Sequence, residues 1–157
     1  MSERSERTSN RSSGHVVLDD TLLLEWLIGD FAVESDEAVA TTAAWWFRLA
    51  RALLRDGGGA LSRQLATSPE DLRRRLLEEV LDLPETVTVL HPRDTIAIAA
   101  GLSARHGLNL LAADALAVAQ VLAGRLLVTV ADDGPRLRAA ATALDIDYRA
   151  VPSGADT

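Results

Sequence analysis

Five aspartates stand beside apolar segments of the sequence and could act together as a chemical group. They are Asp19, Asp20, Asp114, Asp132 and Asp133. The first two follow the apolar run 15–18, the last two follow the run 125–130, and the middle one opens the apolar stretch 112–123. If the fold brings these segments together, carboxylates from distant parts of the chain meet at one place.

Carboxylates that converge cannot all ionise cheaply, because like charges raise each other's pKa. Hard divalent cations such as Mg²⁺ or Mn²⁺ relieve the repulsion, since they bind oxygen ligands. An ion held by three or four carboxylates can orient and activate a water molecule for attack on phosphate. The pattern therefore predicts a metal-dependent hydrolytic site. The alternative is that each aspartate only caps a helix or benefits from its dipole.

Short apolar strands alternate with helices along the segments that carry these acids. The patterns predict strands at 15–18, 86–90, 125–130 and 147–151. They predict helices at 22–28, 37–55, 69–83, 94–106, 112–123 and 135–144. This alternation indicates an α/β fold, a three-layer α/β/α sandwich around a short parallel sheet of about four strands. In such sheets, ligands bind beyond the carboxyl ends of the strands, where Asp19 and Asp132 stand.

Composition sets the broad class of the protein. The 157 residues suit one domain, and 48% apolar residues can cover both faces of a small sheet. Residues 1–14 are predicted to be a disordered tail, 15–151 the domain and 152–157 a second tail. There is no cysteine and no lysine, which excludes disulfides, thiolate chemistry and Schiff bases. No apolar run is long enough to span a membrane, and we expect a cytoplasmic protein.

Four segments, taken in order, resemble the PIN-domain family of ribonucleases. The opening run His15–Thr21 resembles the family's first strand, which ends in an Asp followed by Ser or Thr. The stretch 105–115 resembles the segment that ends in an Asp-Ala pair and begins a buried helix. The stretch 126–133 resembles the late strand with its Thr-x-Asp motif, and 144–151 resembles the last strand. The resemblance extends over residues 15–151.

The resemblance implies an RNA endonuclease that depends on Mg²⁺ or Mn²⁺. On the family's pattern, Asp19, Asp114 and Asp132 would be the catalytic acids, and they would bind the metal together with Asp133. It also implies an RNA substrate and a homodimer. If the protein is the toxin of a toxin–antitoxin pair, an antitoxin protein would be a further partner.

Two departures from the family's pattern support a second hypothesis. Family members usually carry a Glu early in the second main helix, whereas the stretch 41–46 contains no acid. Thr129 is followed by Asp after three and four residues rather than two. The second hypothesis is a PIN-like binding or regulatory module without catalysis. A nucleotide-binding doubly wound domain is disfavoured, because no glycine-rich turn follows the first strand.

Three arginines share one face of the predicted helix 37–55. Arg48, Arg51 and Arg55 are spaced at three and four residues and could hold an RNA backbone, since arginine binds phosphate bidentately. A net charge of −7 means that any RNA must bind at such a local patch or through metal ions. The alternative is a solvated face paired with acids. Trp45 and Trp46 are adjacent, so both cannot face one core, and one of them is available for a base or a partner.

Overall fold

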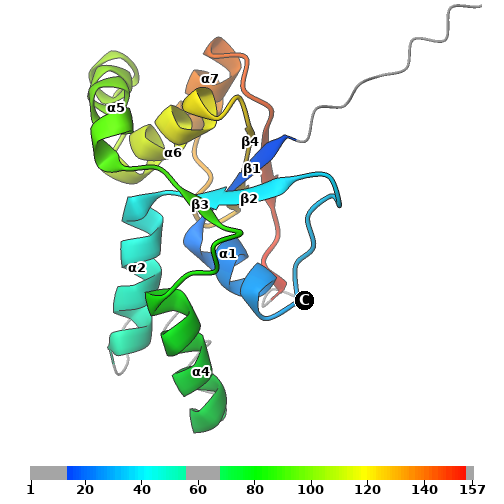
Figure 1. Cartoon of the computed structure of the whole chain (residues 1–157). Helices are drawn as coiled ribbons and strands as arrows, with labels where there is room; N and C mark the ends of the chain where they lie inside the picture. The colour runs from blue at the N-terminus through cyan, green and yellow to red at the C-terminus, as the bar shows by residue number, and fades with distance from the viewer. Residues whose placement is uncertain (1–13, 56–67, 155–157) are drawn as a thin grey trace, which may run out of the picture.

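Five short strands form one parallel sheet in the part of the chain that the computed structural model describes, residues 14–55 and 68–154 (Figure 1). The strands are β1 (His15–Leu18), β2 (Ala38–Thr41), β3 (Thr88–Val89), β4 (Arg125–Thr129) and β5 (Tyr148–Val151). Their order across the sheet is β3-β2-β1-β4-β5. Because all pairs are parallel, the carboxyl ends of all five strands lie at the same edge.

Helices connect the strands and cover both faces of this sheet, giving three layers (Figure 1). The described helices are α1 (Asp20–Leu27), α2 (Ala43–Leu54), α4 (Glu70–Leu81), α5 (Pro92–His106), α6 (Leu110–Val121) and α7 (Pro135–Ala143). None of the described helices is both long and apolar enough to cross a membrane. The α/β class and the three-layer arrangement predicted from the sequence are confirmed.

Strand β1 lies at the centre of the sheet and pairs with strands from opposite parts of the sequence. Val17 is in register with Ala40 of β2 on one side and with Leu126 of β4 on the other. The chain therefore builds the sheet first to one side of β1 and later to the other. A crevice forms at the carboxyl ends of strands where the strand order reverses in this way. This places the candidate site above β1 and β4.

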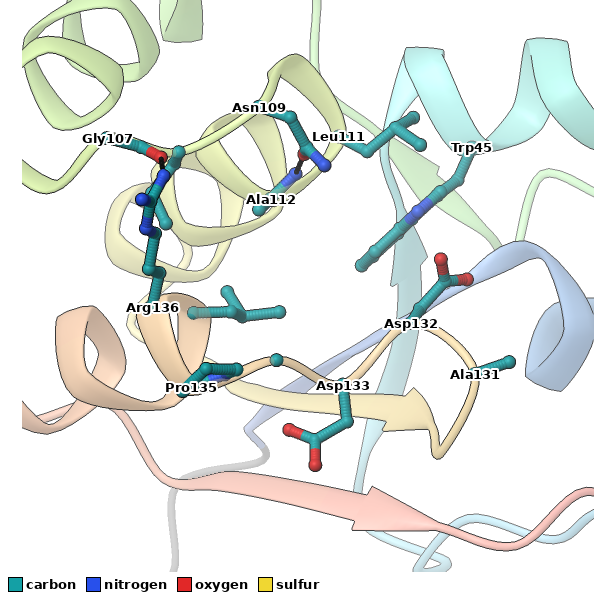
Figure 2. Close-up of a pocket in the computed structure, with 13 residues that line it drawn as sticks. Trp45, Gly107, Asn109, Leu111, Ala112, Ala131, Asp132, Asp133, Pro135 and Arg136 are labelled. Carbon is teal, nitrogen blue, oxygen red and sulfur yellow. Dashed lines mark hydrogen bonds between the residues drawn. The ribbon is translucent and has the colours of Figure 1, made fainter.

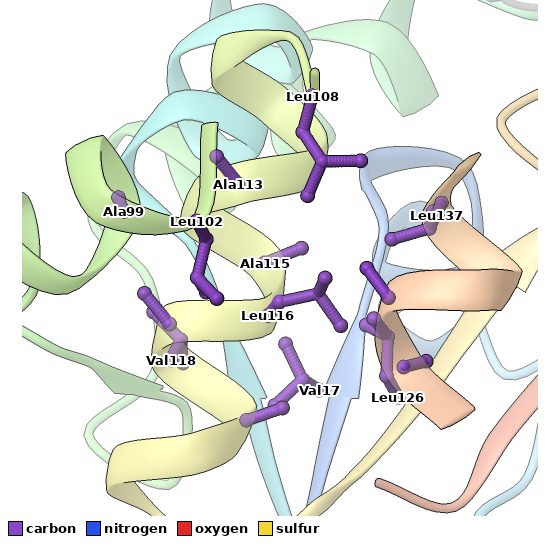
Figure 3. Close-up of a cluster of buried hydrophobic side chains, with 14 of the residues drawn as sticks. Val17, Ala99, Leu102, Leu108, Ala113, Ala115, Leu116, Val118, Leu126 and Leu137 are labelled. Atoms are coloured by element: carbon purple, nitrogen blue, oxygen red, sulfur yellow. The ribbon is translucent and has the colours of Figure 1, made fainter. Parts of the chain in front are cut away.

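The alternation of side chains along the strands divides the core into two clusters. Val17 and Leu126 point to one face and pack under α5, α6 and α7 with Leu116 (Figure 3). Val16 and Leu18 point to the other face and pack with residues of α1, α2 and α4. Each of these strand residues is fully buried, as expected for a parallel sheet covered on both faces.

The fifth strand corrects the prediction of four. Residues 37–55 were expected to form one helix, but Ala38–Thr41 form β2 and only Ala43–Leu54 form α2. Two residues decide the boundary. The Thr41 hydroxyl donates to the Leu18 carbonyl at 2.9 Å, and the Thr42 hydroxyl accepts from the Trp45 amide at 3.0 Å as the N-cap of α2.

The other helices and strands begin and end within a few residues of the boundaries predicted from the sequence. Strand β3 is limited to two residues, and α6 begins at Leu110, so Asp114 lies within the helix rather than at its start. Residues 1–13 of the predicted N-terminal tail lie outside the described residues. At the other end, Ser153 and Gly154 do not leave the domain as the start of a tail. Both donate hydrogen bonds to the buried Glu25 carboxylate on α1, at 2.6 and 2.9 Å.

Candidate metal centre

Asp19 joins the first strand to the first helix and is completely buried. One carboxylate oxygen accepts the Leu22 amide at 2.8 Å, which caps α1. The other accepts the amide and the hydroxyl of Thr129, at 2.5 and 2.8 Å. Asp19 therefore ties the carboxyl ends of β1 and β4 together. A carboxylate has about four lone-pair sites, so these three bonds leave one site for a cation.

Burial makes the Asp19 carboxyl harder to ionise. It raises the pKa of Asp19 from 3.8 to about 6, against the opposing effect of the hydrogen bonds from Leu22 and Thr129. The neighbouring Asp20 carboxylate adds to the increase. At neutral pH the group is mostly ionised, but its charge is held at a cost that a bound cation would lower.

Asp20 and Asp132 share one arginine. Asp20 is the first residue of α1 and is buried, while Asp132 lies in the loop after β4 and is partly buried. The Arg48 guanidinium, from the middle of α2, donates to both oxygens of each carboxylate, including a 3.0 Å bond to Asp132 Oδ1 and a 2.5 Å bond to Asp20 Oδ1. Burial alone would lower the pKa of Arg48, but the hydrogen bonds to the two aspartates outweigh it and raise the pKa.

The three acids Asp19, Asp20 and Asp132 form a group that could hold a metal ion. One oxygen from each lies within 4.8 Å of the others. Mg²⁺–oxygen bonds of about 2.1 Å place ligands on opposite sides of an ion about 4.2 Å apart, so only small shifts are needed. Arg48 offsets one of the three negative charges in this structure, and a divalent cation that displaced it would offset two. The donor set fits a hard cation and offers no soft or nitrogen ligand.

The loop after β4 explains how Asp132 reaches this group despite the longer spacing from Thr129. The amides of Asp132 and Asp133 both donate to the Thr129 carbonyl, at 3.0 and 3.1 Å, which closes a tight turn. The turn returns Asp132 toward β1. Asp19 and Asp132, two of the acids that the family pattern singles out, thus belong to the group, whereas Asp20 belongs to it without being singled out by that pattern.

Asp133 belongs to a separate network. Its carboxylate accepts from the Tyr148 hydroxyl at 2.6 Å and pairs with Arg138, and Figure 2 shows it pointing away from the Asp132 side. The hydrogen bond from Tyr148 lowers the pKa of Asp133, and burial together with this bond raises the pKa of Tyr148. Asp133 is not part of the three-acid group, and its expected role as a metal ligand stays a prediction.

Asp114 also lies outside the three-acid group. It sits half-buried in α6 and accepts from the Thr95 hydroxyl of α5 at 3.3 Å. This bond connects the two helices of the α5–α6 hairpin. The proposed catalytic and metal-binding role of Asp114 therefore stays a prediction.

The three arginines predicted to share one helix face differ in their surroundings, because only Arg48 forms ion pairs with Asp20 and Asp132. Arg48 is turned into the carboxylate group, so its expected role as an RNA contact is not available while these ion pairs persist. Arg51 is exposed on the same helix, and Arg55, the C-cap residue that follows it, is also exposed. The alternative of an arginine paired with nearby acids holds for Arg48.

The two tryptophans at the start of α2 face different cores. Trp45 is 1% exposed and packs with the α5–α6–α7 cluster, while Trp46 is half-buried and donates its indole N–H to the Val80 carbonyl at 2.5 Å. The prediction that they face different surroundings is confirmed, but neither is exposed to stack a base. Phe47, 66% exposed, is the aromatic side chain that α2 presents to solvent.

A pocket of about 490 Å³ opens beside the acid group. Its walls are Trp45, the turn before α6, the loop 131–134 after β4 and the start of α7 (Figure 2). Asp132 lies on the boundary between the acid group and this pocket. A ligand in the pocket would therefore be adjacent to a cation held by the three acids.

Fold and site together define a three-layer α/β protein with an acidic group at the carboxyl edge of its sheet. No family model matches the chain, and no curated protein matches it. Among solved structures, the chain is similar to the crystal structure of PAE2754 from Pyrobaculum aerophilum. The two are 15% identical over 87% of this chain and 88% of that chain, with a TM-score of 0.47. This level of similarity carries no argument about function.

Proposed function

We propose that the protein is a divalent-metal-dependent phosphodiesterase that cleaves RNA. The observation that carries this proposal is the convergence of Asp19, Asp20 and Asp132 within 4.8 Å at the carboxyl edge of the sheet. RNA as the substrate, and Mg²⁺ or Mn²⁺ as the ion, follow from the sequence resemblance and from the hard oxygen donors. The proposal of an antitoxin and of a homodimer as partners also comes from the sequence resemblance.

The acids and Arg48 would have different roles in this reaction. Asp19, Asp20 and Asp132 would hold the cation, which supplies a polarised phosphate oxygen and an activated water when bound. Asp19 is fixed by three hydrogen bonds and would be the ligand whose position varies least. Arg48 already donates to two of the acids, so it would be available to a phosphate once the cation takes its place.

The test is a titration of the full chain with Mn²⁺, followed by electron paramagnetic resonance of the free ion. We expect saturable binding, with Asp132→Asn weakening it by about tenfold or more because one of three charged ligands is lost. Asp147→Asn is the matched control, since Asp147 is exposed just before the first residue of β5, outside the three-acid group, and pairs with Arg149. Cleavage of a labelled RNA is then measured with and without Mn²⁺.

Binding that is absent at millimolar Mn²⁺, or that both variants weaken equally, contradicts the metal centre. If Mn²⁺ binds but RNA remains intact, the centre stands and the nuclease assignment fails. Circular dichroism on each variant verifies that the fold is retained.

A second candidate function is a non-catalytic binding module, favoured by the ion pairs of Arg48. A guanidinium between Asp20 and Asp132 satisfies these acids without any metal. Phe47 and Leu54, 66% and 62% exposed at a spacing of seven residues, lie on one side of α2 and would suit a protein partner. Failure of Mn²⁺ to bind the wild-type chain, together with a retained fold, would favour this candidate.

A further inference from the structure

The pocket beside the acid group has a buried hydrogen-bond donor without a partner. The Trp45 indole extends from α2 into the pocket (Figure 2), and its Nε1 is the buried side-chain atom left without a hydrogen-bond partner among the described residues. An unpaired buried N–H costs about 1–3 kcal/mol. Such a group at a pocket wall points to a ligand that accepts its hydrogen bond.

A second set of donors lies at the start of α7. Gly134 is the N-cap residue and provides no side-chain acceptor, so no side chain satisfies the first-turn amides of Arg136 and Leu137. These three residues and Pro135 line the pocket. The Arg136 guanidinium donates to the Gly107 carbonyl at 3.0 Å and has further N–H groups to offer. Amides at a helix N-terminus with a guanidinium nearby favour a phosphate.

The two acids of the pocket do not cancel this preference. Asp133 turns its carboxylate away, toward Tyr148 and Arg138. Asp132 is paired with Arg48, which offsets its charge. The donors at the start of α7 therefore face a pocket whose nearest negative charges are already compensated.

The rest of the pocket wall is apolar. Leu108, Leu111 and Leu137 line it together with the indole ring of Trp45. The volume of about 490 Å³ is in the range of small-molecule sites. An apolar wall with a single N–H donor suits a flat heteroaromatic ring that has an acceptor at its edge, and the α7 donors lie at the same pocket.

We propose that this pocket binds one nucleotide, with its phosphate on the α7 N-terminus and Arg136. The base would lie against Leu108 and Leu111 and accept the Trp45 Nε1 hydrogen bond. Calling that nucleotide a unit of the substrate strand rests on the proposed function, because Asp132 connects the pocket to the metal centre. The binding itself needs no cation.

The experiment follows amide and indole resonances of ¹⁵N-labelled full-length protein during titration with adenosine monophosphate, without any divalent cation. The three indole signals are assigned by replacing each tryptophan with phenylalanine in turn. We expect saturable shifts of the Trp45 indole and of the Arg136 and Leu137 amides. Adenosine and inorganic phosphate, each with half of the contacts, should bind at least about tenfold more weakly.

Arg136→Gln should weaken adenosine monophosphate binding by about tenfold, since a charge-assisted contact is lost. Arg149→Gln is the matched control, because Arg149 is exposed on β5 and does not line the pocket. A Trp45 indole signal that does not move, or equal weakening by both variants, overturns the proposal. Because no metal is present, a failed Mn²⁺ titration with intact nucleotide binding rejects only the proposed phosphodiesterase.

Discussion

At the scale of single residues, Arg48 determines how the acid group is balanced. Its guanidinium contacts both oxygens of Asp20 and of Asp132, so a cation that binds these acids has to displace it or share them with it. The side chain is only partly exposed, which strengthens the ion pairs relative to a surface pair. The arginine therefore competes with any metal for two of the three ligands.

We predict that Arg48→Gln binds Mn²⁺ more tightly than the wild-type chain, by about tenfold or more, because a competing charge is removed. Isothermal titration calorimetry measures the difference. Arg51→Gln, an exposed change one helical turn further along α2, should leave the affinity unchanged. Weaker Mn²⁺ binding by Arg48→Gln would show that the guanidinium supports the ion rather than competing with it.

The sequence predicted part of this group and not the rest. Asp19 and Asp132 follow apolar runs that are recognisable as strands, so their meeting at one sheet edge was predictable. Asp20 could be a helix-start residue or a member of the group, and nothing local in the sequence distinguishes the two roles. The contact between Arg48 and Asp132 spans 84 positions, and helix periodicity gives only the face of Arg48, not its partner.

At the scale of elements, close contact between β1 and the start of β4 depends on Gly124. A Cβ atom added there would lie 2.7 Å from the His15 carbonyl oxygen, a backbone atom that cannot move aside without shifting the strand. The absence of a side chain at this position lets β4 pair with β1 in the observed register. That pairing in turn brings Thr129 to Asp19.

We predict that Gly124→Ala lowers the free energy of unfolding by about 2 kcal/mol, because the added methyl group forces the two strands apart. Gly101→Ala provides the matched comparison. Gly101 is inside α5 with nothing within 4 Å of an added Cβ, so alanine should stabilise the helix by about 1 kcal/mol. Urea denaturation measures both changes, and a neutral Gly124→Ala would contradict the contact.

Strand β2 is the strand that the sequence pattern did not predict. Residues 38–41 read Ala-Val-Ala-Thr, and together with the following alanines and tryptophans they continue a helical apolar pattern. Because all four side chains are small or apolar and a helical pattern follows without a break, neither alternation nor a turn signal marks these residues as a strand. Tertiary contacts make these residues a strand. They lie between β1 and β3, where Ala40 pairs with both Val17 and Thr88.

At the scale of the whole molecule, Asp19 makes the stability of the fold depend on pH. Its pKa is about 6 in the folded protein and 3.8 as an ordinary aspartate, so the folded state binds the proton more tightly. The contribution is fully present below 3.8 and is lost as the pH rises through about 6. The difference between these pKa values corresponds to roughly 3 kcal/mol.

We therefore predict that the contribution of Asp19 to the free energy of unfolding decreases as the pH rises from 3.8 to about 6. Asp133, whose pKa is lowered by Tyr148, acts in the opposite direction at lower pH. Comparing wild type with Asp19→Asn by urea denaturation across the range cancels that effect and isolates Asp19. Two profiles that run parallel would contradict the raised pKa.

The pairing of β1 with β4 also has a consequence for how the protein is made. Asp19 leaves the ribosome early, yet the Thr129 groups that bind its carboxylate are synthesised 110 residues later. Until β4 is synthesised, the edge of β1 that later pairs with it has no partner strand. A chain cut short before β4 therefore lacks the pair of β1 with β4 and also Asp132, so a prematurely terminated product cannot assemble the three-acid group.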